Sequence, residues 1–225
     1  MHLHLPSVAV FAALGVAVSA NAATIGAGVG TLTLAGANNA VDTPSNGSND
    51  QSRQNLDQSF FVSLPAGVYS ATTWQFNAGQ AGSVTPYLAV LTGADAYQII
   101  AVGDAQVITG GFGVDTTVAF GGSNTFTLNA ATDVYAGIVN PKEVGSQNPI
   151  QTNLNSGSFM DHDNNNDGLM SPAVLGGAVD GFGHTNLPRS YAFSINVDLI
   201  PEPSSALFMV VGLASTLLIG SRRRR

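Results

Sequence analysis

The sequence predicts an all-β protein, an antiparallel β-sandwich of jelly-roll-like type, with an N-terminal signal helix and a C-terminal hydrophobic helix. Short runs of β-branched and aromatic residues recur about every ten residues and alternate with turns rich in Gly, Pro, Asn and Asp. Between the two ends, no stretch shows the spacing of a capped amphipathic helix over more than a turn or two. Cysteine is absent, which excludes disulfide bonds, thiolate metal sites and cysteine nucleophiles.

Charge is scarce and unevenly distributed. Only 9% of the 225 residues are charged, and four of the seven basic residues are the last four residues of the chain. Between residues 23 and 200, three basic residues face thirteen carboxylates, which gives a net charge of −10. Such an acidic body argues against nucleic acid as a partner, because phosphates require a basic surface. A stretch of about 178 residues is long enough for one domain with a packed core.

The N-terminal end has the features of a secretory signal peptide. Residues 8–18 are apolar without interruption, and Ala20 and Ala22 then provide the small residues of an A-x-A cleavage pattern. The run is too short to cross about 30 Å of hydrocarbon, which favours cleavage over anchoring. Residues 1–22 are therefore the expected signal peptide, and the mature chain is expected to begin at Ala23. The alternative is a buried apolar element of the domain.

The C-terminal end combines three features in order: a proline-flanked tripeptide, an apolar run over residues 206–220, and an arginine cluster. Two prolines around one residue prevent helix formation and sheet pairing, so the tripeptide is expected to be extended and exposed. A fifteen-residue helix is about 22 Å long, enough for a temporary span whose arginines stay in the cytoplasm. The motif and the basic cluster consist of Pro201, Glu202, Pro203, Arg222, Arg223, Arg224 and Arg225.

This arrangement over residues 201–225 resembles the PEP-CTERM sorting signal of proteins exported by Gram-negative bacteria. The resemblance implies export by the secretion machinery, a transient stay in the inner membrane, and recognition and cleavage by an exosortase, a membrane protease-like transpeptidase. It also implies release to, or attachment at, the surface of cells that make an extracellular polysaccharide matrix, as in a biofilm. The alternative is an ordinary tail anchor in which the proline pair is accidental.

The interior divides into two parts. Residues 23–58 are expected to form a strand and then a mobile loop or linker, because residues 36–58 are rich in Asn, Ser, Gly and Asp. Residues 59–200 are expected to form the β-domain. In its last strand, apolar and polar residues alternate without a break, which predicts one buried and one solvent-facing side. The clearest expected strands are 60–64, 68–76, 87–91, 97–102, 116–120, 124–129, 134–139 and 190–199.

One acidic loop is a candidate calcium site. Oxygen-bearing side chains alternate along it and Gly168 allows a sharp turn, as in the first half of a calcium-binding loop. Val174 occupies the place of the usual bidentate glutamate, so Asp161 or Asp180 would have to complete the site. The alternative is a solvated Asn/Asp turn without an ion. The expected ligands are Asp161, Asp163, Asn165, Asp167, Leu169 through its carbonyl group, and Ser171; no other cofactor is expected.

Catalysis has less support in the sequence. His184, Asp180 and a serine would make a triad, but no motif selects the serine, so a loop histidine is the preferred interpretation. Carboxylate pairs for glycoside hydrolysis cannot be recognised from sequence, since they depend on spatial distance. The carboxylates considered for such a pair are Asp95, Asp104, Asp115 and Asp133.

Aromatic residues provide a competing hypothesis of carbohydrate binding. Flat rings on a sheet face would stack against sugars. Trp74 is two residues before Phe76 in an alternating strand, so packing of both in the core is the preferred interpretation. The rings considered as a stacking platform are Trp74, Tyr69, Tyr87, Tyr97 and Tyr135.

These observations predict a non-enzymatic exported protein with a structural or adhesive role at the cell surface or in the extracellular matrix. The expected partners are an exosortase, the secretion machinery, the inner membrane for a limited time, and extracellular polysaccharide. The alternatives are a secreted carbohydrate-binding module, which an exposed row of aromatic rings would favour, and a polysaccharide hydrolase, which a close carboxylate pair in a cleft would favour.

Overall fold

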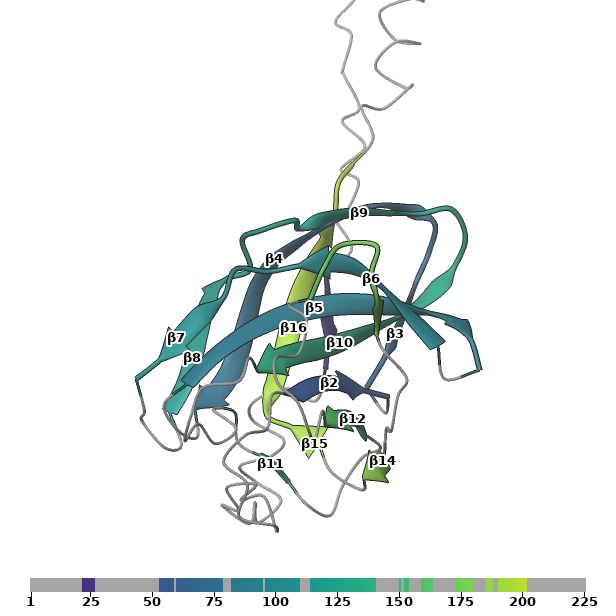
Figure 1. Cartoon of the computed structure of the whole chain (residues 1–225). Helices are drawn as coiled ribbons and strands as arrows, with labels where there is room; N and C mark the ends of the chain where they lie inside the picture. Colours follow the sequence, from purple (N-terminus) through teal and green to yellow (C-terminus); the bar gives the residue numbers. More distant parts are fainter. Residues whose placement is uncertain are drawn as a thin grey trace, which may run out of the picture.

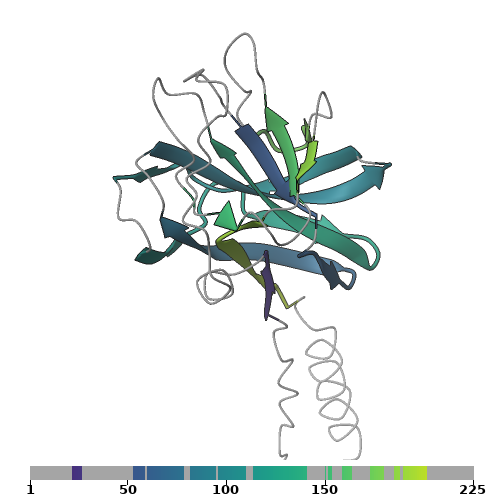
Figure 2. The same ribbon diagram turned by 90° about the horizontal axis from the view of Figure 1, so that it is seen from below.

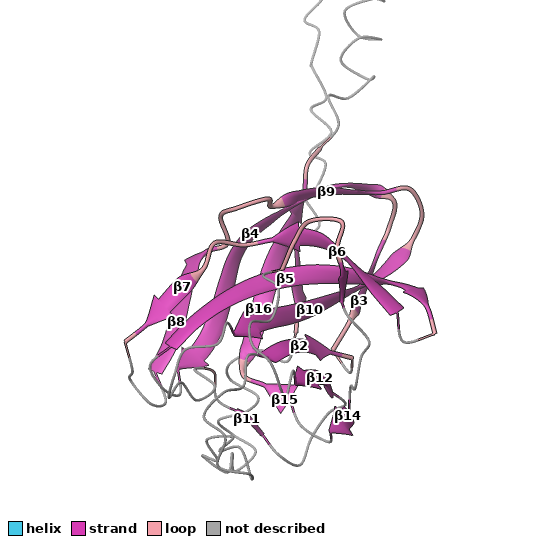
Figure 3. Ribbon diagram, in the orientation of Figure 1, coloured by secondary structure: helices cyan, strands magenta, loops and turns pink. Residues whose placement is uncertain are grey.

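The structure is a computed structural model of the chain. It describes residues 22–26, 53–58, 60–78, 82–94, 96–109, 114–140, 150, 152–153, 159–163, 173–179, 185–187 and 190–201. Within these ranges every regular element is a β-strand, and every pair of neighbouring strands is antiparallel (Figure 3), which confirms the predicted all-β class. None of these residues belongs to a helix long and apolar enough to cross a membrane. The signal helix and the C-terminal helix expected from the sequence lie outside the described residues.

The smaller main sheet has five strands and includes both ends of the described chain. Its strand order is β1-β16-β4-β8, and β9 pairs with β4 beside β8 (Figure 1). The first described strand therefore pairs with the last described one. The strands are β1 (Ala22–Ile25), β4 (Gly67–Ala78), β8 (Val114–Ala119), β9 (Thr125–Leu128) and β16 (Phe193–Leu199).

The larger sheet has nine strands in the order β13-β6-β5-β10-β2-β12-β14, with β3 beside β10 and β7 beside β5. Two further strands, β11 (Thr152–Asn153) and β15 (Ser190–Tyr191), pair with each other. The nine strands are β2 (Arg53–Asp57), β3 (Val62–Leu64), β5 (Gly82–Gly93), β6 (Ala96–Val102), β7 (Gln106–Ile108), β10 (Thr132–Asn140), β12 (Phe159–Asp163), β13 (Ala178–Val179) and β14 (Thr185–Leu187).

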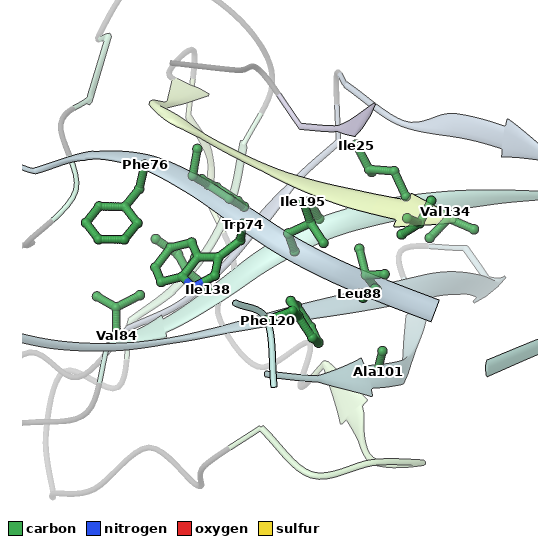
Figure 4. Close-up of a cluster of buried hydrophobic side chains, with 14 of the residues drawn as sticks. Ile25, Trp74, Phe76, Val84, Leu88, Ala101, Phe120, Val134, Ile138 and Ile195 are labelled. Atoms are coloured by element: carbon green, nitrogen blue, oxygen red, sulfur yellow. The ribbon is translucent and has the colours of Figure 1, made fainter. Parts of the chain in front are cut away.

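The main hydrophobic core draws side chains from both sheets. Trp74 and Ile195 come from the five-stranded sheet, and Leu88 and Val134 come from the nine-stranded sheet; all four side chains are fully buried (Figure 4). The view from below shows the two layers of strands (Figure 2). The ring centroids of Trp74 and Phe76 are 4.3 Å apart inside this core, which confirms that both residues face inward.

The connection between β8 and β9 joins the two sheets through backbone hydrogen bonds. The amide of Phe120 donates to the carbonyl of Thr72 in β4, at 3.0 Å. On the other side, the amides of Asp104 and Val102 donate to the carbonyls of Phe120 (2.8 Å) and Ser123 (3.0 Å). Phe120 is fully buried in the main core, so this connection closes one side of the core.

Seven of the eight clearest predicted strands are present, with ends that differ by a few residues, whereas the eighth, 190–199, is divided into β15 and β16, which belong to different sheets. The prediction of a loop or linker over 36–58 is wrong for its last part, because residues 53–57 form β2. This strand lies inside the nine-stranded sheet between β10 and β12, and its Leu56 is fully buried. A single apolar residue among polar neighbours gave no alternating pattern, so the strand depends on pairing on both sides rather than on local sequence.

Candidate functional site

The pairing of β1 with β16 places the predicted signal-cleavage junction inside a sheet. Ala22 lies opposite Asp198, and Ala23 lies opposite Val197. Directly opposed residues in an antiparallel pair have Cα atoms about 4.5–5.5 Å apart. Two residues later, Ile25 is fully buried in the main core. The residue expected to start the mature chain is thus part of the folded domain.

The end of β16 leads directly into the predicted sorting motif. The amide of Ile200 donates to the carbonyl of Val68 at 2.8 Å, which joins the residue after β16 to β4. The next residue, Pro201, is exposed. We call the region formed by Ala22, Ala23, Asp198 and Pro201 the terminal pole; β1 and β16 lie side by side there in both views (Figures 1 and 2).

Polar side chains connect three strands of the five-stranded sheet near this pole. The hydroxyl of Thr24 donates to Oδ1 of Asn196 at 2.7 Å, and Nδ2 of Asn196 donates to the hydroxyl of Thr73 at 2.9 Å. The hydroxyl of Tyr69 donates to the carbonyl of Pro65 at 3.0 Å, and burial raises the pKa of this phenol. The two side-chain bonds of Asn196 link β1 to β16, and β16 to β4.

Most residues of the predicted sites lie outside the described residues. This applies to Ala20, Glu202, Pro203, Arg222, Arg223, Arg224, Arg225, Asn165, Asp167, Leu169 and Ser171, and to Asp95, Asp180 and His184. Asp161 and Asp163 lie on β12, where their backbones pair with Asn55 and Arg53 of β2. Within the described ranges, no three His, Asp or Glu side chains come together in a way that could hold a metal ion.

The five aromatic rings considered as a sugar-stacking platform are buried. Trp74, Tyr69 and Tyr87 have no exposed surface, and Tyr97 and Tyr135 are 5% and 7% exposed. The preferred interpretation, core packing of Trp74, is therefore confirmed, and an open platform made of these five rings is contradicted. The burial of all five rings could not be predicted from the sequence. Alternating apolar and polar residues distinguish the two faces of a strand, but they do not show which face other segments cover.

The outer face of the nine-stranded sheet has its own apolar cluster. On β10, Val134 and Ile138 belong to the main core, whereas Tyr135 and Val139 belong to a second cluster. Successive side chains of a strand point to opposite faces, so this second cluster faces away from the five-stranded sheet. Its members are Leu56, Tyr87, Ala89, Tyr97, Ile99, Tyr135, Val139, Ala173 and Val179.

One corner of this outer face combines an exposed ring with polar groups. Phe61 is 46% exposed, and its ring centroid is 5.4 Å from that of Tyr135. Tyr135 in turn makes a T-shaped contact with Tyr97, with centroids 5.1 Å apart. Asp133 accepts a hydrogen bond from the hydroxyl of Ser63, its cross-strand partner. We call these residues, Phe61, Ser63, Asp133, Tyr135 and Tyr97, the outer-face cluster.

The electrostatics of this cluster follow from burial and from its neighbours. Burial raises the pKa of the Tyr135 phenol, and the nearby Tyr97 and Asp133 raise it further. The hydroxyl of Tyr97 accepts a hydrogen bond from Nε2 of Gln58 at 3.1 Å. The Tyr135 phenol therefore stays neutral at physiological pH.

Phe61 was not among the functional residues predicted from the sequence. The alternation of Phe61 and Ser63 with the inward-facing Val62 and Leu64 was visible, but its exposure depends on which segments cover the outer face. Of the candidate carboxylates that the structure describes, Asp104 follows β6, Asp115 lies on β8 and Asp133 lies on β10. Asp115 accepts a hydrogen bond from Nδ2 of Asn77 at 2.6 Å. Comparison of the chain with protein-family models, with curated proteins and with solved structures finds no match.

Proposed function

We propose that this chain is an exported, non-enzymatic protein with a structural or adhesive role at the cell surface or in the extracellular matrix. In this proposal an exosortase processes it at residues 201–203 after a transient stay in the inner membrane. We further propose that the two sheets form a jelly-roll-like sandwich, which the core shared by both sheets supports.

The observation that carries this proposal is the pairing of β1 with β16. It brings the residue after the predicted signal peptide and the residue that opens the sorting motif to the same end of one sheet. The proposed sorting signal begins at this pole with Pro201, so the domain would meet the bilayer with this end of the sheet while the C-terminal segment is inserted. The terminal pole would then face the membrane, and the rest of the domain would face outward.

The proposal is tested by replacing Pro201, Glu202 and Pro203 with alanine in a tagged protein in its own host. This change leaves the apolar run and the arginines intact, so the hydrophobic drive for membrane residence is preserved. We expect the uncleaved precursor to accumulate in the inner membrane, as seen on an immunoblot of fractionated cells. Replacement of Ser204 and Ser205 by alanine is the matched control and should leave size and location unchanged. An alanine variant of the motif with normal size and location would return the tail to an ordinary anchor.

A carbohydrate-binding function is the second candidate. The observation that favours it is the half-exposed ring of Phe61, on the same sheet face as the Asp133 carboxylate.

A further inference from the structure

We propose that the outer-face cluster binds a neutral polysaccharide, with a pyranose ring stacked on Phe61 and sugar hydroxyls hydrogen-bonded to the Asp133 carboxylate. This inference deepens the proposed function, since an exported location is what would bring the domain to its polysaccharide. It differs from the platform contradicted above, because the ring that meets solvent is Phe61 and the tyrosines lie beneath or behind it.

The ring of Phe61 is exposed to solvent and is supported by neighbouring aromatic rings. Of the described phenylalanine, tyrosine and tryptophan side chains, Phe61 is the one whose exposure reaches the range of surface residues, at 46%. Its ring packs against Tyr135, which itself makes a T-shaped contact with Tyr97. A ring that is already fixed loses little rotational freedom when a ligand stacks on it, so the cost of ordering is low. Aromatic faces offer a flat apolar surface suited to the C–H face of a pyranose.

The hydrogen-bonding groups of the outer-face cluster lie on the same sheet face as Phe61. Asp133 and Tyr135 are two residues apart on β10, so their side chains point to the same face as Phe61. Ser63 lies directly opposite Asp133 on β3 and donates a hydrogen bond to one of its carboxylate oxygens. A carboxylate has about four acceptor positions, which leaves capacity for sugar hydroxyls after Ser63 is bonded. Ring and carboxylate thus lie at neighbouring positions, as a sugar with an apolar face and a polar rim requires.

The exposed apolar surface of this face includes a residue besides Phe61. Leu91 is 48% exposed and is the cross-strand partner of Tyr97, so its side chain lies on the same outer face. It extends the apolar area beyond Phe61, across the strands of one sheet. Such a face is suited to an extended polymer rather than to a single small molecule.

Charge selects among polymers. Residues 23–200 carry a net charge of −10, and Asp133 places one negative charge within the cluster itself. Polyanionic glycans and anionic lipid surfaces would both be repelled by such a domain. A neutral hexose polymer avoids this repulsion, and its hydroxyls donate to the carboxylate, which is a strong charge-assisted hydrogen bond.

The test is binding of the processed protein, purified from its own host, to a soluble neutral β-glucan and a galactomannan, with alginate as the polyanion. Affinity electrophoresis and titration calorimetry give the dissociation constants. Binding to at least one neutral polymer is expected, with Phe61→Ala weakening it about tenfold or more and Asp133→Asn about fivefold. Val107→Ala is the matched control, because Val107 is an apolar residue 78% exposed on β7, and it should bind as the original protein does.

Phe61→Leu guards against misfolding. It keeps an apolar side chain but removes the flat ring, so the thermal unfolding midpoint should stay close to that of the original protein while binding falls as in Phe61→Ala. The inference is overturned if neither neutral polymer binds, if alginate alone binds, or if Phe61→Leu binds normally. Export and processing of these variants are read separately by fractionation. A protein that is exported and processed normally but binds no glycan would refute the platform and leave the proposed function standing.

Discussion

Replacing Gly26 with alanine is expected to detach the first strand from the domain. Gly26 follows β1 and has a φ angle of +116°, which L-residues rarely adopt. An added Cβ would lie 2.7 Å from the carbonyl oxygen of Phe193 and 3.0 Å from the Cα of Ser194, both backbone atoms. The amide of Gly26 also donates to the carbonyl of Phe60 at 3.2 Å, which links the five-stranded sheet to the segment before β3. The turn at Gly26 and the facing backbone of Phe193 and Ser194 cannot relax without moving a strand.

The size of the effect follows from two costs. An unfavourable backbone conformation costs about 1–3 kcal/mol, and forcing an extra carbon into a packed place costs about 1–3 kcal/mol more. Detachment of β1 limits the total loss of stability, because it relieves both the backbone strain and the steric overlap. Its own cost is the exposure of Ile25, whose burial stabilises by about 1.5–3 kcal/mol. We therefore expect a loss of about 2–4 kcal/mol in the free energy of unfolding.

Gly176 provides the matched control. Its φ angle is +78°, so alanine there also meets an unfavourable conformation, but no atom lies within 4 Å of an added Cβ. Gly176→Ala should therefore cost about 1–2 kcal/mol, the conformational part alone. Urea unfolding followed by fluorescence gives both values, since Trp74 is the single tryptophan and is fully buried. Equal losses for the two variants, or an unchanged Gly26→Ala, would refute the steric argument.

Three further results are expected. Gly137→Ala should lower the free energy of unfolding by about 1–3 kcal/mol in urea titrations, because an added Cβ would lie 2.5 Å from Cε2 of the buried, cross-strand Tyr87; an unchanged value would contradict the packing. Millimolar calcium should raise the thermal unfolding midpoint if the loop over 161–171 binds it with an affinity of about 10⁻⁴–10⁻³ M, and identical curves in calcium and chelator would favour a plain turn. Because the pKa of Tyr135 is raised in the folded protein, its contribution to stability is complete below pH 10.0, the ordinary pKa of tyrosine, and is lost as pH rises through the folded-state pKa. Replacing Tyr135 with Phe should therefore flatten the alkaline loss in a pH titration of stability, and an equally steep loss would contradict the shift.

Strands with a clear local pattern could be predicted from the sequence. In 193–199 the predicted inward side is confirmed by the burial of Ile195 and Val197, since one face of β16 packs on the core, but the predicted solvent-facing side is wrong at Ser194, which is 1% exposed. Turns rich in Gly and Pro separated these strands correctly. Local signals of this kind depend only on neighbours in the chain, so they survive without knowledge of the partners.

Pairing over long distances could not be predicted. Ala22–Ile25 is too short to show a period, and it becomes a strand because β16 provides a partner 172 residues further along the chain, as the Thr24–Asn196 bond illustrates. The same holds for β2, whose Leu56 is buried only once β10 and β12 flank it. The outer-face cluster also required the fold, because Phe61 differs from the buried rings in what covers it and not in its sequence pattern.

The order of folding and processing follows from the same pairing. The partner of β1 is the last described strand, so β1 stays unpaired until almost the whole domain has been made. Proteolysis requires a segment that is exposed and free to open, and a strand held in a ladder with Ile25 buried is neither. If the Ala22–Ala23 bond is the cleavage site, its removal therefore belongs to the period before β16 closes the sheet. Closure then fixes the new N-terminus at the same pole as Pro201, where the second cleavage is proposed to occur.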